Sequence, residues 1–398
     1  MNTPNTKQLQ RTVLRQVAIS FLAIFMVSYF VTFSQLSFAS NDSNNRSQTI
    51  NWSSEIAEQE LTIEVYLPAS YDQKSQKKYA VLYTVSGGSR LQVLKAQLDW
   101  LSHVSMGPMP EVILITLPYI QVETNMHPKN ISASGITHEM KTKVLMQEVI
   151  KRVEQQYQTL PFRIIEGFSS NANFLLHVLR YQPELFTEYI ISAPALVLDQ
   201  TQLIKAFSEQ LDRRRYQGIG VYLALGSFTD NRPLFEVIRR HLQQNNLKIT
   251  AHDYSEENYL VLPMRHLSSA ISSIFNDMSP DVARFTEGGI DEVIRYFNNL
   301  ELRYGEVQDS SATLIDLAFW YANNDQSEQA VATISHITKQ HPDNIFFLTR
   351  KALIHTQLAQ PNEAKSTWLA AKAKAQAANN EDALAFINEK LTEFTAPQ

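Results

Sequence analysis

The sequence predicts an α/β protein with a doubly wound, mostly parallel sheet, followed by an all-α helical domain. Three observations carry this prediction. Continuous apolar runs between residues 79 and 254 alternate with amphipathic helical patterns, which is typical of a parallel sheet covered on both faces. The runs end in polar or glycine-containing turns, which right-handed crossovers bring to one edge of the sheet. After residue 280 glycine becomes rare and alanine becomes frequent.

Composition and charge exclude several classes of protein. The chain has 398 residues, which suggests two or three domains. Its net charge is −5 and no long basic run follows residue 16, so a nucleic-acid partner is not expected. Cysteine is absent, which excludes disulfides, thiolate nucleophiles and cysteine-based zinc sites. The ten histidines are scattered and form no H-E-x-x-H motif, so we expect neither a metal site nor a cofactor.

The N-terminus has the features of a secretory signal. The segment from Val17 to Phe33 is almost wholly apolar, and Ser37-Phe38-Ala39 places small residues where signal peptidase cleaves. Three basic residues and no acidic residue precede this segment: Lys7, Arg11 and Arg15. We expect residues 1–39 to be removed and the protein to be exported, to the periplasm or beyond. The alternative is an uncleaved N-terminal membrane anchor; no later stretch is apolar enough to cross a bilayer.

The α/β domain is expected to span residues 56–280, after a flexible, Asn- and Ser-rich segment at 40–55. Alternating or continuous apolar residues predict strands at 61–67, 79–85, 111–117, 163–167, 189–194, 219–226 and 248–254. Helical patterns follow at 91–101, 138–157, 174–179, 234–242 and from 266 onward. The polar stretch 118–137 is long for a connection without secondary structure and is a candidate functional loop.

A serine stands at the turn between the predicted strand at 163–167 and the helix that follows. The text is G-F-S-S-N, and Ser169 occupies the tip. A G-x-S-x-G motif in this place raises a serine hydroxyl above the sheet and directs a helix N-terminus at it. Asn171 stands where the motif has its last glycine, and asparagine tolerates unusual backbone angles better than most residues. The alternative is an ordinary strand, turn and helix without chemistry.

The C-terminal part shows a repeat of 34 residues. Ala318 and Ala330 recur at Ala352 and Ala364, as in tetratricopeptide repeats, where small residues let two helices approach closely. We expect a connecting helical segment at 281–310 and tetratricopeptide-like helical repeats at 311–398. Two units are too few for a free-standing solenoid, so they are expected to pack on the α/β domain and to offer a surface for a protein partner. An unrelated helical appendage is the alternative.

Five short matches carry a resemblance to a known family: Tyr79–Tyr83 (Y-A-V-L-Y), Met109–Ile113 (M-P-E-V-I), Pro161–Ile164 (P-F-R-I), Tyr181–Phe186 (Y-Q-P-E-L-F) and Ile191–Pro194 (I-S-A-P). With them, residues 48–280 resemble the esterase D-like branch of the α/β-hydrolases, which includes ferric-siderophore esterases. Several members carry a tetratricopeptide-like tail. The resemblance implies an α/β-hydrolase fold and a small-molecule ester as substrate or ligand.

The resemblance also implies roles for individual residues. Ser169 would be the nucleophile, which needs a neighbouring base because a serine hydroxyl is a poor nucleophile near neutral pH. The backbone N–H groups of Ser170 and of Gly88 or Ser89 would hold the oxyanion. The acid should follow the strand that ends at Gly226. Its candidates are Asp230 first and Glu236 second.

The base is where this chain departs from the family. The family places its histidine in a phrase like E-N-H-x-x-V, and here the text is E-N-Y-L-V, with Tyr259 at the histidine position. A phenol has a pKa of about 10 and accepts a serine proton poorly at neutral pH. His266 lies seven residues further on and is the candidate base, with His252 a weaker one. The alternative is that His266 lies on a helix and has no catalytic role.

Two functions follow from these observations. The first is an exported serine ester hydrolase that works through an acyl-enzyme on Ser169, with Asp230 and His266 completing the proton relay. The second is a catalytically inactive binding or scaffolding protein that keeps the hydrolase fold and uses the old pocket or the helical repeats. The strand–serine–helix turn and the strand-end Gly87-Gly88 favour the first, whereas Tyr259 and the missing glycine at Asn171 favour the second. A third possibility is an assembly factor of the envelope, in which the helical repeats carry the function.

Overall fold

The computed structural model describes residues 46–103, 107–120, 132–199, 205–207, 209, 212–245 and 247–394. The expected signal at 1–39 and residues 121–131 of the candidate functional loop lie outside the described residues. The chain divides into two compact units, one at Asn44–Thr313 and one that contains Leu314–Gln398. No helix within the described ranges combines the length and the apolar character needed to cross a bilayer.

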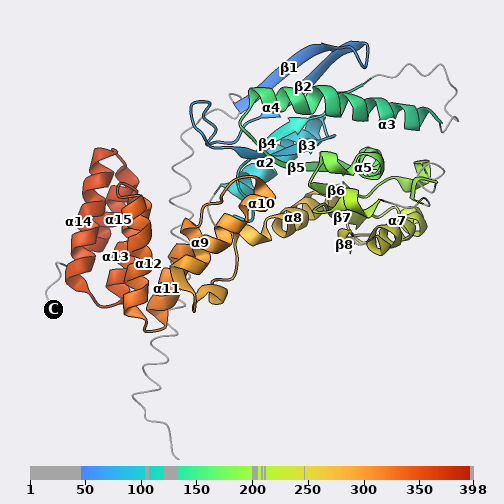
Figure 1. The fold of residues 1–398 in the computed structure, drawn as a ribbon. Coiled ribbons are helices and arrows are strands. Elements are labelled where there is room, and N and C mark those ends of the chain that lie inside the picture. Colours follow the sequence, from blue (N-terminus) through green and yellow to red (C-terminus); the bar gives the residue numbers. More distant parts are fainter. Residues whose placement is uncertain are drawn as a thin grey trace, which may run out of the picture. The chain divides into compact units, whose positions relative to one another are not determined.

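The first unit is built on one eight-stranded sheet with the order β1-β2-β4-β3-β5-β6-β7-β8 (Figure 1). The strands are β1 Ser47–Ser54, β2 Gln59–Tyr66, β3 Tyr79–Thr84, β4 Val112–Thr116, β5 Thr159–Phe168, β6 Glu188–Ser192, β7 Gly220–Leu225 and β8 Lys248–Asp253. The pairs β1–β2 and β2–β4 are antiparallel and all others are parallel. This confirms the predicted mostly parallel sheet. Every residue of β3, β6 and β7 is buried, as their continuous apolar runs predicted.

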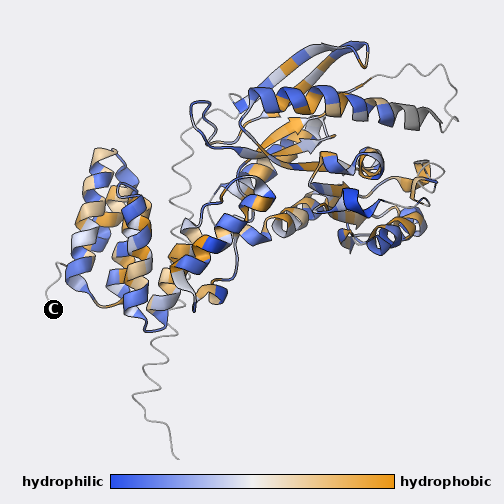
Figure 2. Ribbon diagram, in the orientation of Figure 1, coloured by the Kyte–Doolittle hydropathy of each residue, from blue (hydrophilic) through white to orange (hydrophobic). Residues whose placement is uncertain are grey.

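Helices cover both faces of this sheet. They are α2 Gly88–Ser102, α3 Ser132–Val144, a π-helical turn Leu145–Val149, α4 Ile150–Gln156, α5 Ser170–Tyr181, α7 Arg232–Gln244, α8 Leu262–Ile274, α9 Gly289–Asn299 and α10 Glu301–Tyr304. The helices α5 and α8 lie on opposite faces, because successive residues of a strand point to opposite faces of a sheet. Gly167 of β5 faces Leu175 of α5. The next residue, Phe168, pairs with Ser192 of β6, and the side chain of Ser192 contacts α8. Apolar residues follow the central strands in Figure 2.

Several element boundaries differ from the sequence-based expectation, and two of them differ most. Residues 47–54, expected to be part of a flexible segment, form β1 because they pair along their whole length with β2. Trp52 is buried there and its indole N–H donates to Glu148 at 2.8 Å. The helix expected to begin at residue 138 begins at Ser132 instead.

The segment expected as a connection at 281–310 belongs to the first unit. Arg303 of α10 reaches Glu188 at the start of β6, with a distance of 2.7 Å between guanidinium and carboxylate. Gly305 has a left-handed backbone with φ +78°, and a Cβ there would lie 2.5 Å from Pro161. The α/β unit therefore extends past the expected boundary at residue 280.

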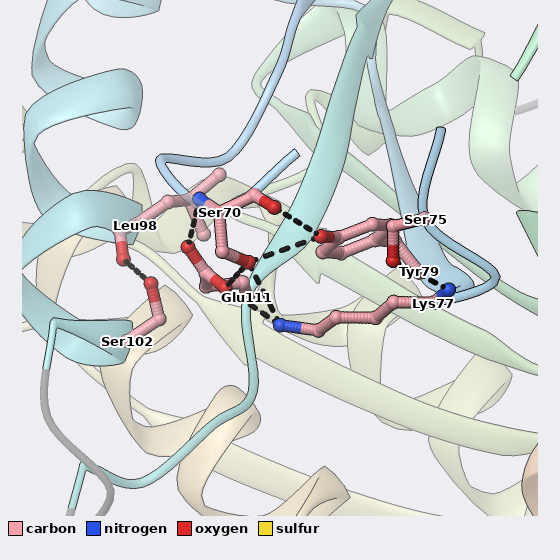
Figure 3. Close-up of polar contacts among 7 residues, drawn as sticks. All are labelled: Ser70, Ser75, Lys77, Tyr79, Leu98, Ser102 and Glu111. Carbon is pink, nitrogen blue, oxygen red and sulfur yellow. Dashed lines mark hydrogen bonds and ion pairs between the residues drawn. The ribbon is translucent and has the colours of Figure 1, made fainter. Parts of the chain in front are cut away.

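A polar clamp secures the connection between β2 and β3 (Figure 3). Glu111, just before β4, accepts from the Ser70 backbone N–H and from the Lys77 ammonium, both at 2.9 Å. The Tyr79 hydroxyl donates to the Ser70 carbonyl at 2.9 Å. Burial opposes the charge of Glu111, but the hydrogen bonds from Ser70 and Lys77 prevail and lower the pKa of the Glu111 carboxyl. The clamp lies before β3 and β4, at the edge opposite to the serine turn.

The described part of the second unit is all-α, and its first helix begins three residues before the division at Leu314. Its helices are α11 Ser311–Asn323, α12 Ser327–Gln340, α13 Ile345–Gln357, α14 Pro361–Ala377 and α15 Glu381–Thr392. The four alanines that define the 34-residue period are completely buried. Asp325 and Ala359, themselves 34 residues apart, both have positive φ at corresponding turns. The side chain of Gln357 donates to Asn323 at 2.6 Å, which joins another pair of positions at this spacing.

Candidate active site

Ser169 lies between the end of β5 and the beginning of α5. Its backbone has φ +60° and ψ −130°, outside the regions that residues with a side chain normally occupy. Such a conformation costs roughly 1–3 kcal/mol and persists only where the surroundings impose it. Here the Ser169 N–H donates to the Ser192 carbonyl on β6 at 3.0 Å, and its carbonyl accepts from the Ala172 N–H at 2.9 Å. The predicted strand, sharp turn and helix are confirmed.

The close approach of strand and helix falls on Gly167 rather than on Asn171. A Cβ at Gly167 would lie 2.8 Å from Leu175 Cδ1 and 3.2 Å from the Asn171 carbonyl oxygen. Asn171 sits inside α5, and its side-chain amide donates to the Val85 carbonyl at 3.3 Å. The residue in the place of the motif's last glycine therefore binds the loop after β3 instead of relieving a steric contact.

The candidate oxyanion donors lie on two neighbouring elements of the same sheet edge. Gly88 and Ser89 begin α2, directly after β3, and Ser170 begins α5, directly after β5. β3 and β5 are paired in parallel, and all three residues are exposed. The first backbone N–H groups of a helix have no partner within it, and the helix dipole favours negative charge there. Two helix N-termini thus open at the edge that carries Ser169.

His266 is not brought to Ser169. Its imidazole, on α8, is completely buried, and Nδ1 shares a hydrogen bond of 2.8 Å with the hydroxyl of Ser192. Burial, with a smaller contribution from nearby His252, lowers the pKa of His266 to about 3. The ring of His252 stacks on Tyr254 at 5.5 Å between centroids. Within the described part of the chain, no hydrogen bond joins the Ser169 hydroxyl to a histidine.

Tyr259 lies at the serine turn. Its ring is 4.6 Å from that of Phe168, the residue before Ser169, and 4.8 Å from that of Phe228, which follows β7. Phe168 and Tyr259 pack on a small buried cluster of Ala193, Ala224 and Leu262. Position 259 is therefore next to the serine turn, where the family's histidine is expected, but an aromatic contact replaces a base.

The two candidate acids, Asp230 and Glu236, lie on the segment that follows β7. Asp230 is exposed in a short 3-10 turn, Thr229–Asn231. Glu236 on α7 pairs with Arg239, with distances of 2.6 and 3.0 Å. Neither carboxylate is hydrogen-bonded to a histidine among the residues that the structure describes. The structure thus brings Ser169, Ser170, Gly88 and Ser89 to one edge, but does not join Asp230, Glu236 or His266 to them.

A buried carboxylate that sequence reasoning did not single out lies three residues before Ser169. Glu166 is 1% exposed and accepts from the hydroxyls of Thr84 and Ser86, the latter at 3.0 Å. Its other oxygen is 3.3 Å from Arg90 on α2. An acidic residue inside the apolar run before the serine turn was the available signal.

Comparison with known proteins places these observations in context. A family model described as "Putative esterase" matches residues 53–392. An IroE-like serine hydrolase from Shewanella oneidensis has a similar fold, with a TM-score of 0.57 and 17% identity over 74% of this chain and 99% of that chain. An uncharacterised protein from Capnocytophaga ochracea gives a TM-score of 0.53 and 12% identity over 88% of this chain and 100% of that chain. No curated protein matches the sequence.

Proposed function

Because the chain belongs to this esterase family, we propose that it hydrolyses small-molecule carboxylic esters through an acyl-enzyme on Ser169, and that it does so slowly. The backbone of Ser169 carries the proposal. A residue held at φ +60° at the tip of a strand–helix turn is strained, and strain of this kind is retained at functional sites.

The proposed steps use groups of the same sheet edge. The Ser169 hydroxyl attacks the ester carbonyl carbon and gives its proton to solvent water, which forms the tetrahedral intermediate. Collapse of the intermediate breaks the ester C–O bond, and the alcohol leaves with a proton from water while the acyl group stays on Ser169. N–H groups of Ser170 and of Gly88 or Ser89 stabilise the negative oxygen of the tetrahedral intermediate. Water then releases the acid. Without a base, a serine hydrolase retains roughly 10³–10⁴-fold acceleration over water, from the oxyanion hole and substrate binding.

The test compares initial rates of p-nitrophenyl acetate hydrolysis by the wild-type protein and by Ser169→Ala. Ser192→Ala is the matched control, because Ser192 is the serine that is hydrogen-bonded to a histidine. We expect the rate to disappear in Ser169→Ala and to persist in Ser192→Ala. Equal rates for the wild-type protein and Ser169→Ala would end the proposal.

A second candidate function is ligand binding without turnover, and the aromatic contact of Tyr259 with Phe168 favours it. In that case the surface at the serine turn would bind an ester and leave it intact. Labelling with a fluorophosphonate separates the two functions, since it requires a reactive serine. Stoichiometric label on Ser169 supports hydrolysis, whereas an unlabelled protein that retains an intact ester supports binding alone.

Two further parts of the proposal concern location and partners. The apolar N-terminal segment supports export with cleavage near Ala39. Sequencing the N-terminus of protein from a periplasmic fraction tests this, and a mature chain that begins near Ser40 is expected.

The 34-residue spacing of buried alanines supports a tetratricopeptide-like role for α11–α15 in binding a protein partner. Loss of that partner when residues 311–398 are exchanged for an unrelated helical tail would support it.

A further inference from the structure

One buried carboxylate, that of Glu166, contacts the segment after β3 that carries the candidate oxyanion donors. Glu166 Oε1 accepts from the hydroxyls of Thr84, at the end of β3, and of Ser86, in the turn. Its Oε2 meets Arg90 Nη2, in the first turn of α2, at 3.3 Å. A single side chain of β5 thus contacts residues on both sides of Gly87 and Gly88.

Backbone and side-chain contacts reinforce this arrangement. The Ser86 N–H donates to the Thr84 hydroxyl at 2.9 Å, and the Val85 N–H donates to the Glu166 carbonyl at 3.4 Å. Asn171, from α5, donates to the Val85 carbonyl at 3.3 Å. Gly87 and Gly88 themselves are exposed, and a Cβ at either would meet nothing within 4 Å. No side chain therefore packs against the Cβ positions of the two glycines, and polar contacts flank them on both sides.

The Glu166–Arg90 pair is poorly optimised for stability. Arg90 Nε and Nη1 are buried and have no hydrogen-bond partner within the described residues. Buried donors without partners destabilise a fold, and an apolar pair of similar size would avoid this penalty. A costly group that is retained beside a candidate site calls for an explanation other than stability.

We propose that Glu166 is a positioning residue that holds the oxyanion loop, Val85–Arg90, in the orientation that directs its N–H groups at the Ser169 edge. This inference rests on the proposed function for its kinetic consequence. Its structural consequence, an ordered loop, does not depend on turnover.

The test uses Glu166→Gln. The amide oxygen can still accept from the two hydroxyls, but its NH₂ group faces Arg90 as donor against donor, so the first turn of α2 loses its anchor. Glu188→Gln is the matched control, because Glu188 is also a buried carboxylate on a central strand, paired with Arg303 at 2.7 Å, at the opposite edge. Both variants lose one buried ion pair and retain all other residues.

Three measurements are made on both full-length variants: hydrogen exchange, the rate of fluorophosphonate labelling, and the kinetics of ester hydrolysis. Hydrogen exchange of peptides that cover residues 85–91 should become faster in Glu166→Gln and stay unchanged in Glu188→Gln. The rate of fluorophosphonate labelling and kcat for p-nitrophenyl acetate should fall about 10–100-fold in Glu166→Gln with KM unchanged, since an oxyanion donor removed outright costs about 10²–10³-fold. Glu188→Gln should retain the wild-type rates.

The outcomes separate this inference from the proposed function. If the wild-type protein neither labels nor turns over, the proposed function fails, and exchange at residues 85–91 still decides whether Glu166 orders the loop. If exchange and rates in Glu166→Gln equal those in Glu188→Gln, the inference is wrong. The comparison with Ser169→Ala then still decides whether the protein hydrolyses esters.

Discussion

The most informative perturbation is Tyr259→His, which places an imidazole where the family has its base. The Tyr259 ring lies 4.6 Å from Phe168, the neighbour of Ser169. A histidine is smaller than a tyrosine, so it fits this position without moving the backbone. The change should create the general base that the described residues do not bring to Ser169, and hydrolysis should become faster.

The size of this gain in rate depends on whether an acid orients the new imidazole. A positioned base contributes about 10²–10⁴-fold to a rate. Asp230 is exposed and is not hydrogen-bonded to position 259, so no acid would orient the new imidazole. Loss of the orienting acid lowers the rate of a serine protease by about 10⁴-fold, so we expect the lower limit, about 10²-fold in kcat. The lost ring contacts with Phe168 and Phe228 should cost about 1–2 kcal/mol of unfolding free energy.

The assay is p-nitrophenyl acetate hydrolysis between pH 5 and pH 9. A neutral imidazole is the active form, so the rate of Tyr259→His should rise with pH through about 6.5. Tyr259→Phe is the control, because it keeps the ring and removes only the phenol oxygen, and it should behave like the wild-type protein. A folded Tyr259→His that is no faster than Tyr259→Phe would refute the reasoning that a base at position 259 can reach Ser169.

Three further predictions concern stability. Ser169→Gly removes the side chain that makes φ +60° unfavourable, so urea unfolding should show a gain of about 1 kcal/mol while fluorophosphonate labelling disappears; a loss of stability would contradict the strain. Gly167→Ala places a methyl group 2.8 Å from Leu175 Cδ1 and should lower the unfolding free energy by about 1–3 kcal/mol in the same assay, whereas a neutral effect would mean that α5 can move away. The pKa of His266 is about 3 when folded and 6.5 when exposed, so the unfolded state binds more protons between these values. Stability should therefore fall as the pH drops from 6.5 toward 3, by up to about 1.4 kcal/mol per pH unit for this group, and His266→Asn should reduce that slope; an unchanged slope would show that His266 is not buried in its neutral form.

The parallel sheet and the serine turn could be predicted because their signals are local. Strands such as β3 and β7 are buried and almost wholly apolar, and a glycine-containing turn follows each of them. The sequence signal for the serine turn is also local, because it consists of Gly167 before Ser169 and a helical pattern after it. The strand β1 could not be predicted in this way, because its polar sequence is ordered by pairing with β2 and by the burial of Trp52.

The partners of buried polar side chains were beyond sequence reasoning for a related reason. His266 lies on the face of α8 that meets β6, so its partner is Ser192 and not Ser169. Glu166 is acceptable inside β5 only because Thr84, Ser86 and Arg90 surround it. Both contacts join residues more than 70 positions apart, and no local pattern specifies which side chains meet across a sheet.

The most direct test of Ser169 as the nucleophile is a search for the acyl-enzyme itself. The wild-type protein is mixed with an excess of p-nitrophenyl acetate, quenched in acid and digested, and the peptide that contains Ser169 is weighed by mass spectrometry. We expect an acetyl group on Ser169, absent from the Ser169→Ala protein and present in Ser192→Ala. An unmodified Ser169, or acetyl groups only on lysines and other serines, would contradict a nucleophile at this turn.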